Sequence, residues 1–258
     1  MSTVKVNELS TYSGTDISIE TGKTVAGTAS QFKMTGGSSG QYVQTDGAGA
    51  LSFATVAETG FSDMKFKTAS ETYTVPAGIT KIVIDLISAG GGGGGSDGNW
   101  TSGGSAGSNA IKTLAVSVGQ TYTITIATYG AGGTSSGSGG TGGTASFVNA
   151  SGTTVNLQCT GGGGGVVNGA PGVGGTATGG DLNINGARGS SGIPAGQSAW
   201  RGASTRWGFS GGQLDISTTS AQAGVGYGAG GCGAYYVGTS SSVGADGRPG
   251  LCVITEYK

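Results

Sequence analysis

Hydrophobic and polar residues alternate along several short stretches of the chain, a pattern that predicts half-buried β-strands. Over residues 82–87 the alternation places Ile82, Ile84 and Leu86 on one face of a strand and Val83 and Ile87 on the other. We therefore expect both faces of this strand to be partly covered.

The same alternation predicts a β-hairpin over residues 111–130, with its turn at Gly119 and Gln120. Further strands are expected on either side of a turn at residues 76–78, and in residues 144–149, 153–159 and 251–258. No 11-residue window has a helical period. The sequence predicts an all-β fold: a short N-terminal β shaft module and then a glycine-rich, β-sandwich-like domain.

The strands predicted in residues 1–60 are shorter and more polar than those predicted in residues 61–258. This N-terminal segment contains short polar strands at 4–9 and 15–20, and a hairpin over 41–56 whose turn holds Asp46, Gly47, Ala48 and Gly49. Large apolar residues are too few here to build a core within one chain. We expect partner chains to stabilise this segment, with a homotrimer as the assembly.

Glycine follows the best strand directly, since Gly90–Gly95 is an unbroken run and the chain holds 59 glycines but only 4 prolines. Such a run is either a flexible linker or a segment packed where no side chain fits. A recurrence at every third residue favours packing, because three residues per turn is the period of an extended polyproline II-type helix. We therefore predict a bundle of polyglycine II helices. The recurring triplets are 137/140/143, 169/172/175, 186/189/192 and 244/247/250.

Composition narrows the classes of protein. Charged residues make up 10 % of the chain and the formal net charge is −1, which does not favour nucleic-acid binding. No apolar run is long enough to cross a membrane, and the first residues lack the apolar core of a signal peptide. Cys159, Cys232 and Cys252 are odd in number and widely spaced, which favours buried free thiols over a disulfide, in a chain made in a reducing cytoplasm.

Catalytic motifs are weak. The absence of histidine excludes a Ser-His-Asp triad and histidine metal sites. The letters GKT at 22–24 lack the first glycine of a phosphate-binding loop, and GSGGTG at 137–142 precedes no helix. Paired carboxylates for glycoside cleavage stay open, with Asp85, Asp97, Asp181, Asp215 and Asp246 as candidates. We expect no enzyme activity, no cofactor and no metal.

Binding chemistry is concentrated in the segment SAWRGASTRWGF, residues 198–209. Aromatic faces stack on sugars, and arginine pairs with carboxylate or phosphate. The alternative is that the tryptophans cover glycines that have no side chains of their own. A second loop, Asp97 to Trp100, interrupts a glycine run in the same way, whereas Tyr235 and Tyr236 are favoured as core strand residues. The candidate receptor-binding residues are Trp200, Arg201, Arg206, Trp207, Phe209, Asn99 and Trp100.

Several stretches resemble the glycine-rich C-terminal domain of bacteriophage tail fibres over roughly residues 63–258. They are TYTVPAGITKIVIDLISAGGGGGG, VGQTYTITIA, TGGGGG, GGDLNINGARG and RPGLCVITEY, in that order. The segment TASQFKMTGGSSGQYVQTDGAGALSFATV, residues 28–56, likewise resembles a fibre-shaft module. Cys252 departs from the usual aliphatic residue, and 194–209 is poor in glycine for its surroundings.

This resemblance implies a viral tail fibre protein of the virion. Residues 1–60 would attach and trimerise the chain through other tail or fibre proteins, and 61–258 would be the receptor-binding domain. Its partners would be host surface polysaccharide or an outer-membrane protein, with no membrane insertion. The alternatives are a structural fibre or spacer protein whose loops bind another phage protein, and an ice-binding protein, for which the residues between the glycines are too irregular.

Overall fold

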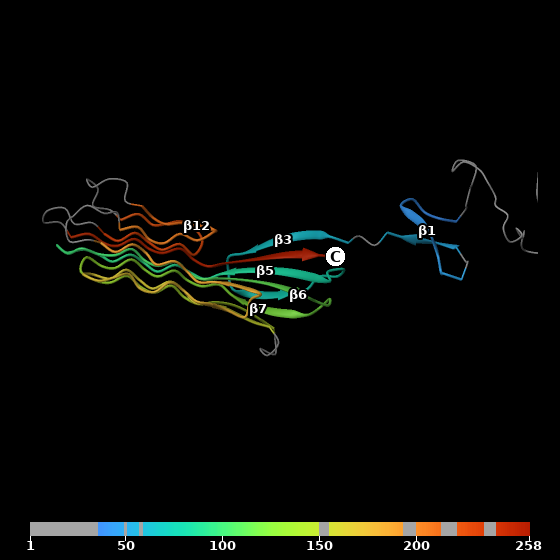
Figure 1. Cartoon of the computed structure of the whole chain (residues 1–258), viewed down its shortest axis with the longest axis horizontal. Coiled ribbons are helices and arrows are strands. Elements are labelled where there is room, and N and C mark those ends of the chain that lie inside the picture. Colours follow the sequence, from blue (N-terminus) through green and yellow to red (C-terminus); the bar gives the residue numbers. More distant parts are fainter. Residues whose placement is uncertain are drawn as a thin grey trace, which may run out of the picture. The chain divides into compact units, whose positions relative to one another are not determined.

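The computed structural model describes residues 36–48, 51–56, 59–149, 155–192, 200–212, 221–234 and 241–258. The chain divides into two compact units, residues 1–58 and 59–258. Within the described residues the regular secondary structure is all strand, in antiparallel sheets and without a helix (Figure 1). The predicted all-β class is confirmed.

In the first unit, β1 (Gln41–Thr45) pairs antiparallel with β2 (Leu51–Thr55), so the predicted hairpin is confirmed. Its turn contains Gly47 at a φ of 83°, a left-handed conformation that glycine adopts without steric cost. The strands expected at 4–9 and 15–20 lie outside the described residues.

The second unit contains two five-stranded sheets, ordered β11-β6-β5-β14-β3 and β10-β9-β8-β7-β4. A further short pair joins β12 and β13. The strands of this unit are β3 (Phe61–Lys67), β4 (Glu71–Thr74), β5 (Lys81–Ile87), β6 (Asn109–Ala115), β7 (Thr121–Thr125), β8 (Ala145–Asn149), β9 (Asn156–Cys159), β10 (Ala177–Thr178), β11 (Leu182–Ile184), β12 (Gly208–Phe209), β13 (Val225–Gly226) and β14 (Leu251–Tyr257).

One hydrophobic cluster joins the facing sides of the two five-stranded sheets. Ile82, Ile84 and Leu86 of β5 are fully buried in it, together with Phe147 and Leu157 from the other sheet. On the opposite face of β5, Ile87 is buried and Val83 is half-buried, so both faces are covered as the alternation predicts. That opposite face, called the outer face below, carries the candidate site.

The hairpin predicted over residues 111–130 is wrong. The chain does turn at Gly119, whose φ is 80°. However, β6 pairs with β5 and β11, whereas β7 pairs with β4 and β8 in the other sheet. The turn therefore passes from one sheet to the other, because both strands have an apolar face that must reach the shared core.

Gly90–Gly95 is buried and hydrogen-bonded, not a flexible linker. Its six N–H groups donate in turn to segments 245–248, 102–105 and 137–140, returning to the same segment at every third residue. Carbonyls of residues 89–94 accept in the same rotation from 162–165, 130–133 and 231–234. Six segments thus surround residues 89–95 within the described chain, and we call this assembly the glycine bundle (89–95, 101–108, 130–134, 137–143, 161–166, 228–234 and 242–250).

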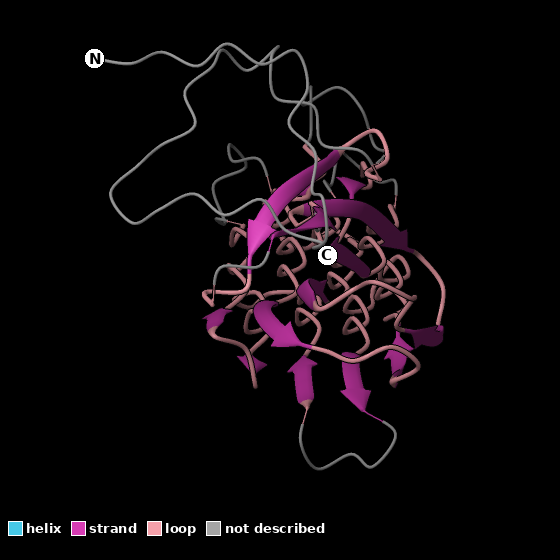
Figure 2. Ribbon diagram, turned by 90° about the vertical axis from the view of Figure 1, so that its right-hand side faces the viewer, coloured by secondary structure: helices cyan, strands magenta, loops and turns pink. Residues whose placement is uncertain are grey.

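The segments of the glycine bundle extend from one end of the sheets and run side by side (Figures 1 and 2). Their approach leaves no room for a Cβ atom: one placed on Gly93 would lie 1.9 Å from the carbonyl oxygen of Cys232. In two of the predicted triplets, 186/189/192 and 244/247/250, a Cβ at any of the three positions would lie 2.6 Å or less from another atom. In the first triplet Gly140 and Gly143 have more space, and their neighbours Gly139 and Gly142 make the close contacts instead.

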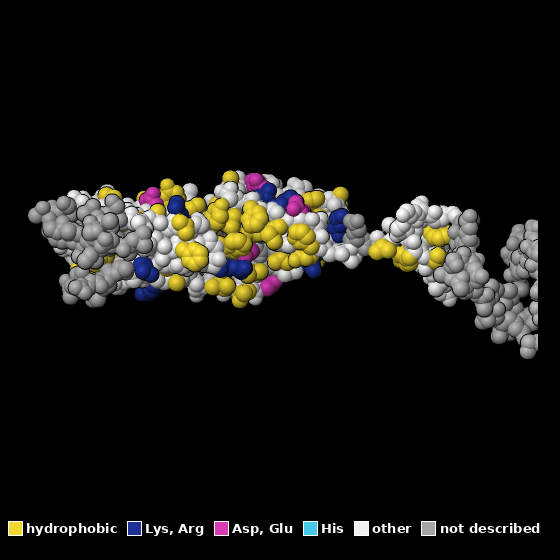
Figure 3. Space-filling model, turned by 90° about the horizontal axis from the view of Figure 1, so that it is seen from above, with side chains coloured by type: hydrophobic (Ala, Val, Ile, Leu, Met, Phe, Trp, Pro, Cys, Tyr) yellow, Lys and Arg dark blue, Asp and Glu magenta, His cyan; other side chains and the backbone are white. Residues whose placement is uncertain are grey.

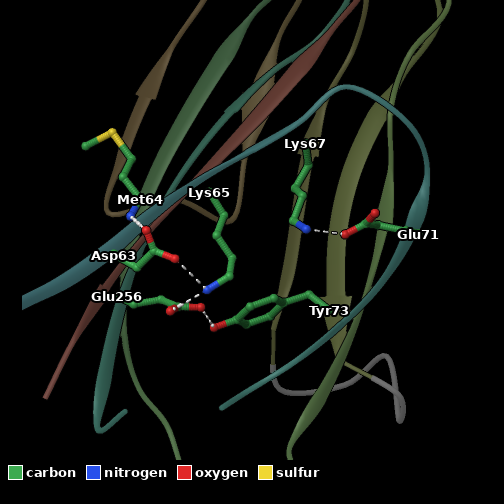
Figure 4. Close-up of polar contacts among 7 residues, drawn as sticks. All are labelled: Asp63, Met64, Lys65, Lys67, Glu71, Tyr73 and Glu256. Atoms are coloured by element: carbon green, nitrogen blue, oxygen red, sulfur yellow. Dashed lines mark hydrogen bonds and ion pairs between the residues drawn. The ribbon is translucent and has the colours of Figure 1, made fainter.

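A buried carboxylate links the sheets at the strand edge. Glu256 on β14 is 2 % exposed, and it accepts hydrogen bonds from Lys65 Nζ at 2.6 Å and from the Tyr73 hydroxyl at 2.8 Å (Figure 4). Lys65 also pairs with the exposed Asp63, so its ammonium lies between two carboxylates. The three partners come from β3, β4 and β14, and the contact fixes the β4 edge of one sheet against the other.

Candidate functional site

Asp85 is the centre of a polar cluster on the outer face of β5. Its Oδ2 accepts a hydrogen bond from Trp207 Nε1 at 3.1 Å and lies 3.4 Å from Arg206 Nη1. Its Oδ1 accepts from Asn109 Nδ2 at 2.6 Å. One strand carboxylate therefore positions an asparagine from β6 and the adjacent arginine and tryptophan of residues 206–207.

The Trp207 ring is half-buried between two other side chains. Phe66 of β3 meets it edge-on with a centroid distance of 6.5 Å, and the Arg206 guanidinium lies over the ring at 5.6 Å. A tight turn presents this pair, because Thr205 N–H donates to the Gly208 carbonyl and Thr205 Oγ1 accepts from Trp207 N–H. The arrangement presents a cation and an aromatic face on a rigid support.

The predicted residues of 198–209 do not form one surface. Phe209 is 74 % exposed and follows Trp207, and Arg201 is also exposed. Trp200 is 3 % exposed, and a Cβ on Gly192 would lie 1.9 Å from its indole nitrogen. Its ring therefore packs directly on glycine backbone, which is the covering role weighed as the alternative.

Asn99 and Trp100 lie next to a different part of the glycine bundle. Asn168 Nδ2 donates to Asn99 Oδ1 at 3.1 Å, and Asn168 N–H donates to the Trp100 carbonyl. Asn99 is exposed and Trp100 half-buried. The structure thus gives two candidate surfaces: the cation–aromatic surface (Arg206, Trp207 and Phe209) and the 97–100 loop. Tyr235 and Tyr236 lie outside the described residues.

The carboxylates left open for glycoside cleavage have different hydrogen-bond partners in the described structure. Asp181 accepts from Lys112 Nζ and Asp246 accepts from Gly132 N–H, partners that neither shares with Asp85. Asp215 lies outside the described residues. Within the described chain, no three Cys, Asp or Glu side chains gather as a metal site would require, and no helix is long and apolar enough to cross a membrane.

Asp85 and Phe66 are site residues that sequence reasoning did not assign to binding. Asp85 is the one charged residue between Ile82 and Ile87, and a charge inside an apolar strand is a signal that it has partners. Phe66 carried no comparable signal, because its exposed ring is evident only once β3 is placed at the sheet edge.

Large apolar side chains surround the cation–aromatic surface on the same outer face. The pairing register places Phe66, Val253, Asp85, Ile111 and Leu182 in one row across five strands. Hydrophobic side chains gather over the strand-bearing part of this unit in the view of Figure 3. The exposed members on β3 and β11 are Phe61, Met64, Phe66, Leu182 and Ile184, 42–64 % exposed.

Comparison with protein families matches residues 66–257 to the glycine-rich domain. A search of curated proteins found no match. The matched range begins within β3 and ends at the last residue of β14, so it includes the glycine bundle and both five-stranded sheets except for the first part of β3. The chain therefore belongs to the glycine-rich domain family.

Proposed function

We propose that the chain is a bacteriophage tail fibre protein of the virion that attaches to the host cell surface. The resemblance of residues 28–56 and 63–258 to fibre modules supports this role. So does a scaffold in which backbone hydrogen bonds, rather than a large core, hold long segments together. We assign the glycine-bundle segments to polyglycine II helices, on the strength of the three-residue rotation of their donors, and the two five-stranded sheets to a β-sandwich.

The cation–aromatic surface is the binding surface that we propose. The observation that supports it is the pairing of Asp85 with both Arg206 and Trp207. A carboxylate that holds both Arg206 and Trp207 fixes their geometry before a ligand arrives, and preorganisation lowers the ordering cost of binding. Arginine and aromatic side chains are enriched where binding energy concentrates. The partner is a surface polysaccharide or an outer-membrane protein of the host, and residues 1–60 join other fibre proteins as a homotrimer.

The test is binding of labelled protein to candidate host cells. An Arg206→Ala/Phe209→Ala variant is compared with Asn99→Ala/Trp100→Ala and with wild type, after circular dichroism and sedimentation show each to be folded and equally assembled. We expect the first variant to lose at least tenfold in binding and the second to lose less. The reverse order would move the site to the 97–100 loop, and no binding of wild type to any host tested would argue against attachment.

A structural virion protein is the second candidate, and the apolar outer face favours it. Contiguous exposed apolar side chains on a soluble protein mark a contact with another protein. In that role Phe61, Met64 and Leu182 would be covered by another phage protein or by copies of this chain. Sedimentation of wild type beside Met64→Ser/Leu182→Ser distinguishes the cases: self-association through this face predicts that the variant dissociates.

A further inference from the structure

A pocket of about 260 Å³ lies beside the cation–aromatic surface. It is smaller than the roughly 300–1,000 Å³ of pockets that hold drug-sized ligands, so a single small unit fills it. Three segments form the lining: 107–109, where the glycine bundle enters β6; 184–187, where β11 ends; and 204–206.

The lining combines fixed polar groups with two apolar side chains. Ser204, Arg206 and Asn185 contribute a hydroxyl, a guanidinium and a carboxamide, while Ile184 and Ala187 contribute carbon surface. Arg206 is held by Asp85 and stacked over Trp207, so its position does not depend on a ligand. Hydrogen-bond donors and acceptors beside a small apolar wall match a ligand that carries hydroxyl groups around a carbon ring.

Asn109 adds an acceptor whose orientation is fixed. It is 6 % exposed, and its Nδ2 donates to Asp85 Oδ1 at 2.6 Å and to the Leu86 carbonyl at 2.9 Å. Both partners are acceptors, so the amide cannot be reversed. Its buried Oδ1 receives no hydrogen bond from any described residue. Buried acceptors of this kind are normally satisfied. Because almost none of this oxygen is open to solvent, a donor from water or a ligand in the pocket reaches it only when a neighbouring lining residue shifts.

The positive charge of Arg206 is balanced by the negative charge of Asp85. A neutral ligand is therefore favoured over a charged one. Arg206 is a lining residue and Asp85 lies within 3.4 Å of it, so the pair brings no net charge. A simple anion such as sulfate has no donor for Asn109 Oδ1 and would approach the Asp85 carboxylate. A sugar hydroxyl both donates and accepts, and it serves asparagine and arginine alike.

We propose that this pocket binds one neutral monosaccharide unit of a host-surface glycan. Its place in attachment rests on the proposed function, but binding of a free sugar does not, so the two are tested separately. Hydroxyl groups of the sugar ring contact Arg206 and the part of the lining that contains Asn109. The carbon face of the sugar packs on Ile184 and Ala187.

The experiment titrates glucose, galactose, N-acetylglucosamine and glucuronate into the full chain, followed by saturation-transfer NMR and by the side-chain signals of Asn109 and Arg206. Ala187→Phe fills the pocket from an exposed position. Ala131→Phe is the matched control, since residue 131 is also exposed and belongs to segment 130–134, which hydrogen-bonds to none of the lining segments.

We expect a neutral sugar to shift the Asn109 and Arg206 signals in wild type and Ala131→Phe, with at least tenfold weaker binding in folded Ala187→Phe. Binding that survives in Ala187→Phe, or no binding of any sugar at tens of millimolar, overturns the proposal and leaves a pocket filled by water alone. Tighter binding of glucuronate than of every neutral sugar overturns the charge argument. Sugar binding without cell binding would refute host attachment and leave the pocket proposal standing, and cell binding without sugar binding would do the opposite.

Discussion

The carbonyl oxygen of Cys232 occupies the place where Gly93 would carry a Cβ atom, 1.9 Å away from it. Neither backbone can move alone, because Gly93 N–H donates to Ala245 and Cys232 O accepts from the N–H of that same residue. We predict that Gly93→Ala lowers the free energy of unfolding by roughly 3 kcal/mol, as severe overpacking does.

The adjacent Gly94 provides the control. A Cβ there would lie 3.2 Å from the Thr101 Cβ and 3.4 Å from the Gly165 carbonyl, so Gly94→Ala should cost roughly 1 kcal/mol. Denaturant unfolding of the two variants measures the difference. Equal costs would show that glycine is needed at these positions for its backbone freedom, and not for the space it leaves.

Asp85 should matter for stability as well as for binding. Asp85→Ala leaves Trp207 Nε1 and one Asn109 N–H without their acceptor, so we expect a loss of roughly 2–3 kcal/mol. Trp207 fluorescence should shift as its ring gains freedom. Asp63→Ala, which removes an exposed partner of Lys65, should leave the unfolding midpoint nearly unchanged. An unchanged midpoint in Asp85→Ala would contradict the anchoring role.

The buried carboxylate of Glu256 gives a third prediction. Glu256→Ala removes the acceptor of the Tyr73 hydroxyl and one of the two carboxylates beside the Lys65 ammonium, which keeps Asp63, and it should cost roughly 2–3 kcal/mol. Tyr73→Phe removes one hydrogen bond and keeps the ring, so it should cost about 1 kcal/mol. Calorimetry of both variants tests this order. A smaller loss in Glu256→Ala than in Tyr73→Phe would mean that the desolvation cost of the carboxylate exceeds the contacts it makes.

Alkaline pH should destabilise the second unit. Burial raises the pKa of the Cys159 thiol to about 12, and burial first and then the bond to Glu256 raise the pKa of Tyr73. Burial lowers the pKa of Lys65, but its bonds to Glu256 and Asp63 outweigh that, and the net shift is upward. Groups whose folded pKa is raised contribute stability below their unfolded pKa and lose it as the pH rises through the folded value.

The loss should therefore begin near pH 9, the ordinary pKa of the thiols, and continue through pH 12. Thermal midpoints between pH 7 and 11 measure it, with Cys159→Ala as a variant whose decline should be shallower. A midpoint that stays constant across this range would mean that these groups titrate alike in the folded and unfolded chain.

The sequence was most informative where a local pattern alone decides the structure. Alternation located β5 and the β1–β2 hairpin, and the odd, scattered cysteines are indeed buried free thiols. It failed where two strands that are neighbours in the chain pair with strands in different sheets. β6 and β7 are joined by a short turn, yet each pairs elsewhere, because the partners β4 and β5 lie in different sheets and long-range pairing is invisible in the local pattern.

The candidate site was only partly accessible from the sequence for a related reason. Aromatic and arginine content indicated 198–209, but Trp200 and Trp207 have different surroundings, the one on glycine backbone and the other on a strand carboxylate. Composition cannot distinguish the two rings. Their separation follows from an extended backbone, in which residues seven positions apart lie beside different neighbours.

The three-way rotation of donors in Gly90–Gly95 imposes a counting rule on the length of the chain. Inserting one residue into this run would turn every later N–H by a third of a revolution, so that an amide now bonded to 245–248 would face another segment. Inserting three would restore the phase. Segments of the glycine bundle can therefore lengthen or shorten only in steps of three residues if their hydrogen bonds are to be kept. The loops between them are not bound by this rule.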